Sequence, residues 1–200
     1  MSVDDGRFGL TIANRGLPEY EILDEPGGVT IALTLLRCVG WLSRGDLSSR
    51  RGGAGPQLQT PGAQMAGRHV LEYSIIPHEG DWASAKAHVL AVQFVRAMRA
   101  RWQNHGIGHL PAEASLLDID SAAFQVSAIK RAEDGNGVIV RLYNTLDAPA
   151  EGNVDLTPVT GDVSMVNLNE EHITDVPRVG AGVPIAARRN EIVSLRFRRQ

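Results

Sequence analysis

Short hydrophobic runs in the first third of the chain predict β-strands. Residues 9–14 and 20–23 form two such runs, and Gly or Pro residues follow each of them. Residues 29–40 are almost continuously apolar, which predicts a long strand that is buried on both faces. A fourth strand is predicted over residues 69–77.

One segment carries the hydrophobic spacing of an α-helix. Asp81 is a suitable N-cap for this helix, because its carboxylate can accept N–H groups that the first turn leaves unpaired. The helix should end near Trp102, since Asn and Gly residues follow. Its apolar face would consist of Leu90, Ala91, Phe94 and Met98.

The segment before the fourth strand, residues 43–68, has no hydrophobic periodicity. It contains six glycines and two prolines. A loop of this length inside a compact domain is usually either functional or disordered. Its glycine-rich part, residues 51–56, lacks the Lys-Ser/Thr pair and the following helix of a phosphate-binding loop, so a plain loop is the simpler interpretation.

From about Leu116 the pattern changes to short alternating strands at even spacing, which is typical of an antiparallel β-sandwich. We therefore expect a mainly β protein with two lobes, joined by the helix and its trailing loop, with a boundary near residues 110–120. The strands predicted in the second lobe are residues 123–129, 137–143, 152–156, 162–168 and 191–197.

Composition and charge exclude several classes of protein. The 200 residues are 43% hydrophobic and 22% charged, which are proportions of a folded globular chain. A net charge of −3 supplies no broad basic field, so we expect no nucleic acid partner. The longest apolar runs are too short to span a bilayer, so we expect no membrane partner either. Cys38 is the one cysteine, and the first residues carry no secretory signal pattern, which together favour a cytoplasmic location.

The candidate catalytic and metal-binding groups are sparse. His105 and His109 are four residues apart, as zinc ligands on a helix can be, but two intervening glycines make linker histidines the simpler interpretation. Neither Gly-x-Ser-x-Gly nor a complete phosphate-binding loop is present. We therefore expect neither a catalytic residue nor a metal site in this chain.

Three pairs of carboxylates could in principle serve a glycosidase, which needs two carboxyl groups on either side of a sugar bond. Solvated strand edges explain such pairs more simply. The arginines near the C-terminus would lie partly on a strand exterior and partly in a tail, or contact another domain. The pairs are Glu19 with Glu21, Asp118 with Asp120, and Glu170 with Glu171; the arginines are Arg188, Arg189, Arg196, Arg198 and Arg199.

An ordered set of phrases resembles the C-terminal β region of bacterial glycoside hydrolase family 38, the α-mannosidases. No single phrase is diagnostic, but their order and spacing match over nearly the whole chain. The phrases are residues 14–21 (NRGLPEYE), 33–37 (LTLLR), 41–43 (WLS), 60–64 (TPGAQ), 77–82 (PHEGDW), 130–133 (KRAE), 140–144 (VRLYN) and 170–171 (EE).

The resemblance implies a fold and a set of partners. Residues 1–115 would be the C-terminal part of a supersandwich domain, similar to that of sugar mutarotases, and residues 116–200 a smaller terminal β-sandwich. The family's N-terminal β/α domain carries zinc and the aspartate nucleophile of a retaining mechanism, and nothing in this chain corresponds to it. The resemblance thus implies the final segment of an α-mannosidase, which would be inactive alone and would act with that catalytic domain on a mannose-containing glycan.

The resemblance also implies three substrate-binding residues. In the family, the β region closes one side of the catalytic cleft and lends polar side chains to the bound sugar. Asn14, Arg15 and Tyr20 lie in the segment that resembles this part. If Arg15 serves the sugar alone, its replacement should leave folding unchanged. The alternative is that Asn14 and Arg15 simply form a turn before Gly16.

A freestanding carbohydrate-binding or interaction module with a sandwich fold is the alternative function. Such a module would present exposed aromatic rings to sugars. Trp41, Trp82 and Trp102 all lie in apolar contexts that predict burial, which favours the mannosidase segment. Trp82, beside His78 and Asp81, would pack the helix onto the sheet at a strand-to-helix corner.

Overall fold

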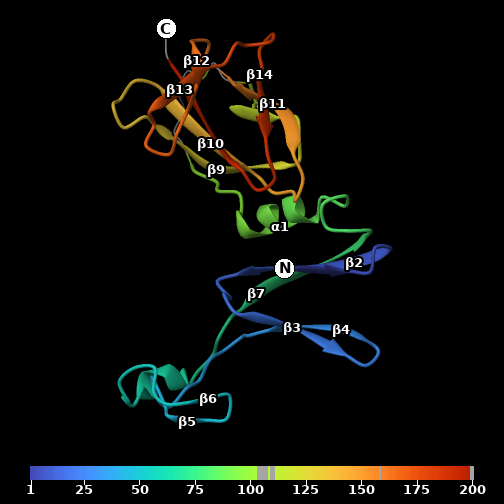
Figure 1. Ribbon diagram of the computed structural model, residues 1–200, viewed down its shortest axis with the longest axis vertical. Coiled ribbons are helices and arrows are strands. Elements are labelled where there is room, and N and C mark those ends of the chain that lie inside the picture. The colour runs from blue at the N-terminus through green and yellow to red at the C-terminus, as the bar shows by residue number, and fades with distance from the viewer. Residues whose placement is uncertain (103–107, 109–110, 158, 199–200) are drawn as a thin grey trace. The chain divides into compact units, whose positions relative to one another are not determined.

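The computed structural model describes residues 1–102, 108, 111–157 and 159–198. It is mainly β, with several antiparallel sheets and one α-helix (Figure 1). Contacts divide the chain into two compact units, Met1–Met98 and Arg99–Gln200. The division between the units lies at 98/99. The first strand described after it begins at Leu117, just beyond the predicted lobe boundary of 115/116.

Unit 1 is built on a three-stranded antiparallel sheet in the order β1-β2-β7. β1 is Ser2–Asp4, β2 is Phe8–Arg15 and β7 is Glu72–Glu79. The turn between β1 and β2 is held by Asp5, whose carboxylate accepts two backbone N–H groups at 2.8 Å. The prediction for β2 is confirmed, and β7 begins and ends slightly later than predicted.

The helix α1, Ala87–Val95, packs against β2 and β7, where it covers Thr11 and Ala13. It is shorter than predicted at both ends. Asp81 does accept the N–H groups of residues 83 and 84, each at 2.8 Å, but this caps a separate turn. The left-handed Lys86 (φ 53°) lies between that turn and the helix.

The expected apolar face of the helix is therefore partly wrong. Leu90 is exposed, and Met98 lies beyond the helix end and is fully exposed. The sheet side of α1 is formed instead by Ala87, Ala91 and Phe94, which follow the i, i+4, i+7 spacing of one helix face. No helix in the described part of the chain is long and apolar enough to span a membrane.

The predicted long buried strand over residues 29–40 is also wrong. The strand β4 covers only Gly28–Leu33 and pairs with β3, Tyr20–Glu25, in an isolated hairpin. All of its side chains are exposed or half-buried, because no further described strand pairs with this hairpin. Continuous hydrophobicity in this run reflects apolar surface rather than a closed core.

The Gly-rich segment contains only short elements. β5 (Asp46–Leu47) and β6 (Arg50–Arg51) form a small hairpin, and the 3₁₀ helix η1 covers Pro61–Gln64. Backbone hydrogen bonds close the loop at its base, from Leu42 N to Leu58 O at 2.9 Å and from Thr60 N to Gly40 O at 3.0 Å.

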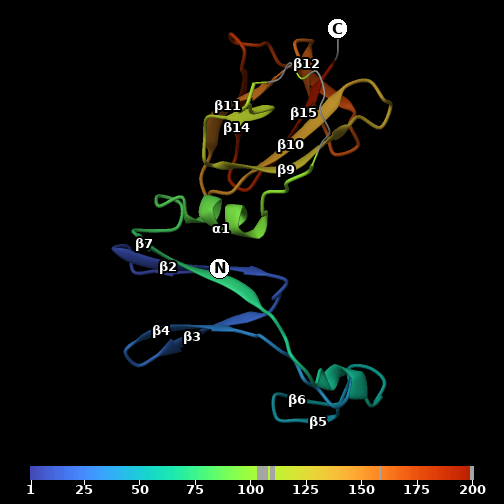
Figure 2. The same ribbon diagram turned by 180° about the vertical axis from the view of Figure 1, so that it is seen from behind.

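Unit 2 is an antiparallel β-sandwich, as predicted (Figures 1 and 2). One sheet has the order β13-β12-β15-β10-β9 and the other β14-β11-β8. The sequence missed β8, β13 and β14, which are only three to five residues long. The bounds are β8 Leu117–Ile119, β9 Phe124–Arg131, β10 Val138–Asn144, β11 Ala150–Leu156, β12 Val163–Val166, β13 His172–Asp175, β14 Val183–Ala187 and β15 Ile192–Phe197.

Both sheets of unit 2 contribute alternate side chains to one hydrophobic core. The turn from β9 to β10 needs glycine at Gly137 (φ +112°), because a Cβ there would lie 2.3 Å from the Phe197 carbonyl oxygen. The innermost residues of the core include Val140, Leu142, Val154, Val183, Leu195 and Phe197, all with no exposed surface.

A buried carboxylate joins the turn between β9 and β10 to the turn between β12 and β13. Glu170 accepts the backbone N–H of Glu133 at 2.8 Å and pairs with Lys130 Nζ at 2.9 Å. These bonds, the backbone N–H first, hold the pKa of the Glu170 carboxyl below its usual value. Arg196 Nη2 lies 3.5 Å from the same carboxylate. Residues 130–133 and 170–171 thus serve the sandwich itself.

Asn144 provides a direct test of the sandwich. Its fully buried amide donates to Ala148 O at 2.7 Å and Arg188 O at 3.0 Å, and accepts the Leu146 N–H at 2.9 Å. Asn144→Ala should lower the free energy of unfolding by about 3 kcal/mol, since three hydrogen bonds are lost at roughly 1 kcal/mol each. Chemical denaturation followed by circular dichroism measures the change.

The matched control is Asn136→Ala, because Asn136 is exposed and its side chain bonds to no other described residue. This variant should stay within about 0.5 kcal/mol of the wild type. Equal stability of the two variants would contradict the assigned role of Asn144.

Candidate functional site

Asn14 lies near the end of β2, opposite Tyr73 of β7. Its side-chain oxygen accepts the backbone N–H of Leu17 at 2.9 Å, which fixes the turn that follows the strand. The hydrogen bond of the side-chain oxygen therefore supports the alternative interpretation, in which Asn14 forms a turn before Gly16. The amide nitrogen of Asn14 bonds to no other described side chain or backbone group.

Arg15 is held by the fold of unit 1. Its Nε donates to the carbonyl oxygen of Phe94 at 3.0 Å and its Nη2 donates to the same oxygen, in the last turn of α1. Its Nη1 pairs with Glu72 of β7 at 2.9 Å, and the guanidinium lies 4.6 Å from the centre of the Phe94 ring. Arg15 thus satisfies a helix C-terminal carbonyl that has no partner within the helix.

These contacts argue against the expectation that Arg15 can be replaced without effect on folding. Asn14 and Arg15 are successive residues of one strand, so their side chains point to opposite faces of the sheet. Arg15 lies on the face that carries α1, and Asn14 lies on the other face. Within this chain the two side chains do not converge on one ligand.

Tyr20 begins β3 and is 55% exposed. In the hairpin register it lies opposite Leu33, on the same face as Ile22 and Ile31. Its ring therefore belongs to an apolar hairpin face, and its hydroxyl bonds to no other described residue.

The carboxylate pairs do not form two-carboxylate sites. Glu19 pairs with Arg37 at 3.3 Å, and Asp120 accepts both the backbone and the side-chain N–H of Asn153. Asp118 lies opposite Asp155 on the outer face of a sheet, where like charges repel. The remaining pair, Glu170 and Glu171, holds turns of the sandwich.

No metal site is formed by the residues that the structure describes. Among them, no group of three or more His, Cys, Asp or Glu side chains comes together. His105 and His109 lie outside the described residues, as does Arg199. Three of the other C-terminal arginines form ion pairs within unit 2: Arg188 with Glu191, Arg189 with Asp147, and Arg196 with Asp134.

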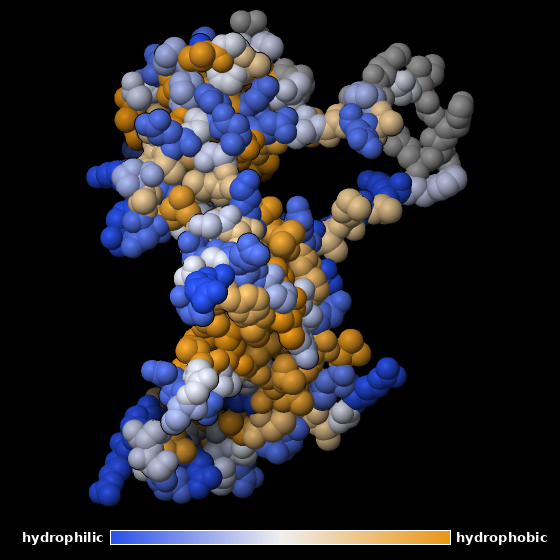
Figure 3. Space-filling model, turned by 90° about the vertical axis from the view of Figure 1, so that its right-hand side faces the viewer, coloured by the Kyte–Doolittle hydropathy of each residue, from blue (hydrophilic) through white to orange (hydrophobic). Residues whose placement is uncertain are grey.

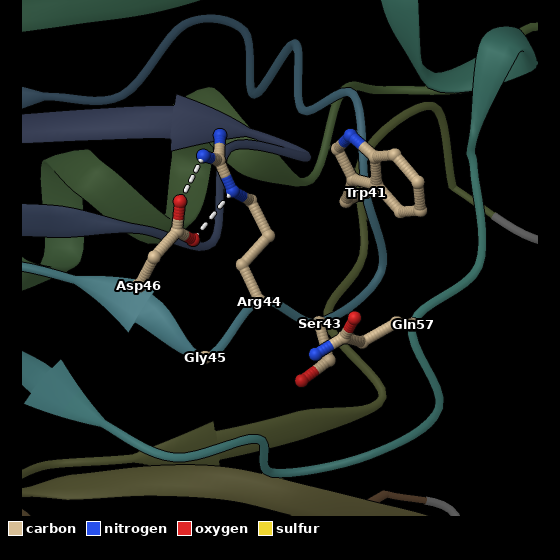
Figure 4. A pocket seen from close by; sticks show the side chains of 6 residues that line it. All are labelled: Trp41, Ser43, Arg44, Gly45, Asp46 and Gln57. Atoms are coloured by element: carbon tan, nitrogen blue, oxygen red, sulfur yellow. Dashed lines mark hydrogen bonds and ion pairs between the residues drawn. The ribbon is translucent and has the colours of Figure 1, made fainter.

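A pocket that the sequence did not predict opens in the loop between β4 and η1. We call it the loop pocket; it has a volume of about 440 Å³ and is lined by Trp41, Ser43, Arg44, Gly45, Asp46 and Gln57. Figure 4 shows the indole of Trp41 at one side and the paired Arg44 and Asp46 at the other, with Ser43 and Gln57 also lining the pocket.

Arg44 and Asp46 form a two-point ion pair. Nε and Nη2 of Arg44 donate to the two carboxylate oxygens of Asp46 at 2.8 and 2.5 Å (Figure 4). The hydrogen bonds raise the pKa of the Arg44 guanidinium and lower the pKa of the Asp46 carboxyl. Both groups are therefore charged at neutral pH, in a planar arrangement typical of Arg–carboxylate pairs.

The prediction that all three tryptophans are buried is wrong. Trp41 is 40% exposed at the loop pocket, and Trp102 is 89% exposed. Trp82 is half-buried at the expected corner, with its ring edge-on to His88 at a centroid distance of 5.2 Å. The Arg-x-Asp spacing at residues 44–46 in a Gly-rich loop is the sequence signal that could have identified the pocket.

The terminal sandwich matches a known protein family. Residues 123–195 match the family described as "Glycosyl hydrolases family 38 C-terminal beta sandwich domain". A curated relative from Halalkalibacterium halodurans, named "Putative mannosylglycerate hydrolase", is 32% identical over 200 residues. That match covers 98% of this chain and 20% of the relative.

Two solved structures from Enterococcus faecalis are similar to the whole chain. One is described as a protein in glycosyl hydrolase family 38 and the other as an α-mannosidase. Each is 28% identical with a TM-score of 0.73 and covers 98% of this chain, which in turn covers 21% and 20% of them. The chain thus spans about a fifth of the length of these relatives. By these matches the chain corresponds to the C-terminal β region of the glycosyl hydrolase family 38 proteins that it resembles.

Proposed function

We propose that this chain is the C-terminal β part of a longer family 38 enzyme that hydrolyses α-mannosidic bonds with retention of configuration. It closes one side of the catalytic cleft and is inactive alone. The observation that carries the proposal is the match over 98% of this chain to proteins about five times as long, one of them described as an α-mannosidase.

The open face of the β1-β2-β7 sheet supports a place beside other domains. The helix covers the face that holds Thr11 and Ala13. The opposite face is apolar and remains largely in contact with solvent. It consists of Val3, Phe8, Leu10, Ile12, Tyr73, Ile75 and Pro77, and Phe8, Tyr73 and Ile75 are each more than half exposed.

The β3–β4 hairpin adds to this apolar surface. Its face with Tyr20 also carries Ile22, Val29, Ile31 and Leu33. Figure 3 shows hydrophobic residues gathered over the part of unit 1 that holds α1, β2, β7 and the hairpin. Such a surface is unusual for an independent domain and fits one that is covered by more of the same polypeptide.

The finer fold that we propose for unit 1 is part of a supersandwich, whose second layer comes from the preceding region of the enzyme. A sheet with one helix-covered face and one apolar open face fits this arrangement. We place the zinc ion and the aspartate nucleophile in the enzyme's N-terminal catalytic domain, which is this chain's main partner. The single cysteine, Cys38, fits a reducing, cytoplasmic location.

The substrate in this proposal is a mannose-containing glycan or glycoside. The name of the Halalkalibacterium relative adds mannosylglycerate to the candidates. Asn14, Arg15 and Tyr20 remain our proposed substrate-side residues at the cleft edge. The free amide nitrogen of Asn14 and the Tyr20 hydroxyl are available for sugar hydroxyls, whereas Arg15 also anchors α1.

A freestanding carbohydrate-binding module is the second candidate, because Trp41 is exposed beside polar side chains. The open apolar sheet of unit 1 argues against it, since an independent module would expose that surface permanently. The two candidates differ in whether the chain needs an upstream domain.

The isolated chain should hydrolyse no aryl α-mannoside, with or without added zinc, whereas the longer protein should do so. The reason is that the missing four-fifths of the relatives' length would carry the nucleophile and zinc ligands. Release of nitrophenol from p-nitrophenyl α-mannoside measures both. Zinc-dependent turnover that copurifies with the isolated chain as a single species would contradict the proposal.

Ile75→Ala tests whether the open sheet face is covered in the longer protein. Ile75 is 56% exposed here, so the substitution should change the isolated chain's stability by less than about 0.5 kcal/mol. In the longer protein it should cost about 2–5 kcal/mol, as expected for a buried isoleucine. Ile173→Ala is the matched control, because Ile173 of β13 is 57% exposed in unit 2. Equal effects of the two substitutions in the longer protein would argue that the face stays open.

Arg15→Ala and Tyr20→Phe separate anchoring from substrate binding in the longer protein. Arg15→Ala should lower the free energy of unfolding by about 1–3 kcal/mol, since Phe94 O loses a charged donor. Tyr20→Phe should leave stability unchanged and lower kcat/KM about tenfold, as for one lost hydrogen bond to a sugar hydroxyl. Thermal melts measure the change in stability, and steady-state kinetics measure the change in kcat/KM. Tyr143→Phe on unit 2 is the control. Unchanged kcat/KM in Tyr20→Phe would remove Tyr20 from the site.

A further inference from the structure

We propose that the loop pocket is a binding subsite for one neutral hexopyranose ring, with Trp41 against the ring face and Arg44, Asp46 and Gln57 on its hydroxyls. The inference rests on the proposed function for the identity of the sugar, which we take to be a mannose residue of the glycan. The chemistry that recognises a pyranose ring is present in the pocket itself.

Trp41 supplies an apolar surface with a polar edge. A pyranose ring has a face of C–H groups, and an indole is the largest flat apolar surface that a side chain can offer to it. Trp41 is 40% exposed although its backbone is fixed by an antiparallel bridge to Gln59. The ring is thus presented to solvent by an ordered backbone.

The polar side chains of the pocket retain unused hydrogen-bonding capacity. Arg44 uses Nε and Nη2 on Asp46, which leaves the N–H groups of Nη1 for a ligand. Each Asp46 oxygen accepts one hydrogen bond from Arg44 and can accept another. The Gln57 amide bonds to no other described residue and adds donors and an acceptor.

The charge of the pocket favours a neutral ligand. Among the described residues, Arg44 and Asp46 are the only ionisable groups that line it, and each keeps the other charged. Their charges cancel, so an anion or a cation gains little net attraction. Vicinal hydroxyls can donate to the carboxylate and accept from the guanidinium at once, which uses both members of the pair.

The loop is closed independently of any ligand, which lowers the entropy cost of binding. Backbone bonds join Leu42 to Leu58 and Thr60 to Gly40, and Ser43 Oγ accepts the Ala54 N–H at 3.1 Å. The volume of about 440 Å³ lies within the range of small-molecule sites.

The experiment titrates the ¹⁵N-labelled 200-residue chain with methyl α-D-mannopyranoside and follows the indole N–H resonances. Trp41→Phe assigns the Trp41 signal, and Trp102 serves as the internal reference because it is exposed outside the pocket. We expect a saturable shift of the Trp41 resonance with a millimolar Kd. D-mannitol, which has the hydroxyls but no ring face, should give no saturable shift.

Two variants test the polar contacts, and one is a matched control. Gln57→Ala and Asp46→Asn should each weaken binding about tenfold, the effect of one lost hydrogen bond of about 1.4 kcal/mol. Gln64→Ala changes an exposed glutamine of η1, outside the pocket, and should leave Kd unchanged. The backbone spectrum of each variant reports whether the loop remains folded.

Three results would overturn the subsite. The first is no shift of Trp41 up to about 100 mM ligand, well above millimolar affinity. The second is an equal shift of Trp102, and the third is an equal loss of affinity in Gln64→Ala. Rejection of the subsite can be distinguished from rejection of the proposed function. Mannoside hydrolysis by the longer protein without binding at Trp41 would reject only the subsite, and binding at Trp41 without hydrolysis would reject only the mannosidase assignment.

Discussion

The sheet of β1, β2 and β7 has two faces, and α1 covers only one of them. Alternate residues of a strand point to opposite faces, so the helix that buries Thr11 and Ala13 leaves Phe8 and Ile75 in solvent. Arg15 adds to this arrangement, because it ties the last turn of α1 to the end of β2 and to Glu72 of β7. Three strands and one short helix bury little apolar surface, so a cover over the second face would add to the stability of unit 1.

In unit 2, the apolar faces of the sheets are covered by other residues of the same unit. Its two sheets cover each other, and the largest side chains without any exposed surface, such as Phe197 and Leu142, all belong to it. The family match falls on residues 123–195, within this self-contained sandwich. The two units therefore differ in how completely their sheets are covered, which explains why unit 1 carries the broad hydrophobic surface seen in Figure 3.

The sequence predicts strands well where alternation and turn residues agree, as in β2, β9, β10 and β15. The prediction fails where an apolar run is not buried or where the backbone conformation is not reflected in the side-chain pattern. The apolar run after Gly28 indicates burial, but no further described strand pairs with the β3–β4 hairpin, so β4 is short and open. The helix was predicted too long because the left-handed backbone at Lys86 has no signature in side-chain spacing. The resemblance to family 38 pointed to the relatives that the comparisons found, which residue patterns alone could not do.

Candidate binding residues are hard to predict from the sequence, because binding depends on which polar groups the fold has already used. Arg15 lies in the segment that resembles a sugar-binding part of the family, yet all three of its guanidinium nitrogens bond within unit 1. Arg44 lies in a segment without periodicity, yet its backbone is held by a closed loop and its Nη1 remains free for a ligand. A charged side chain that anchors a helix must break those bonds before it can bind a sugar, whereas one that is oriented by a single carboxylate need not. By the same physical criterion, Tyr20, with its free hydroxyl, is the stronger of our proposed substrate-side residues and Arg15 the weaker.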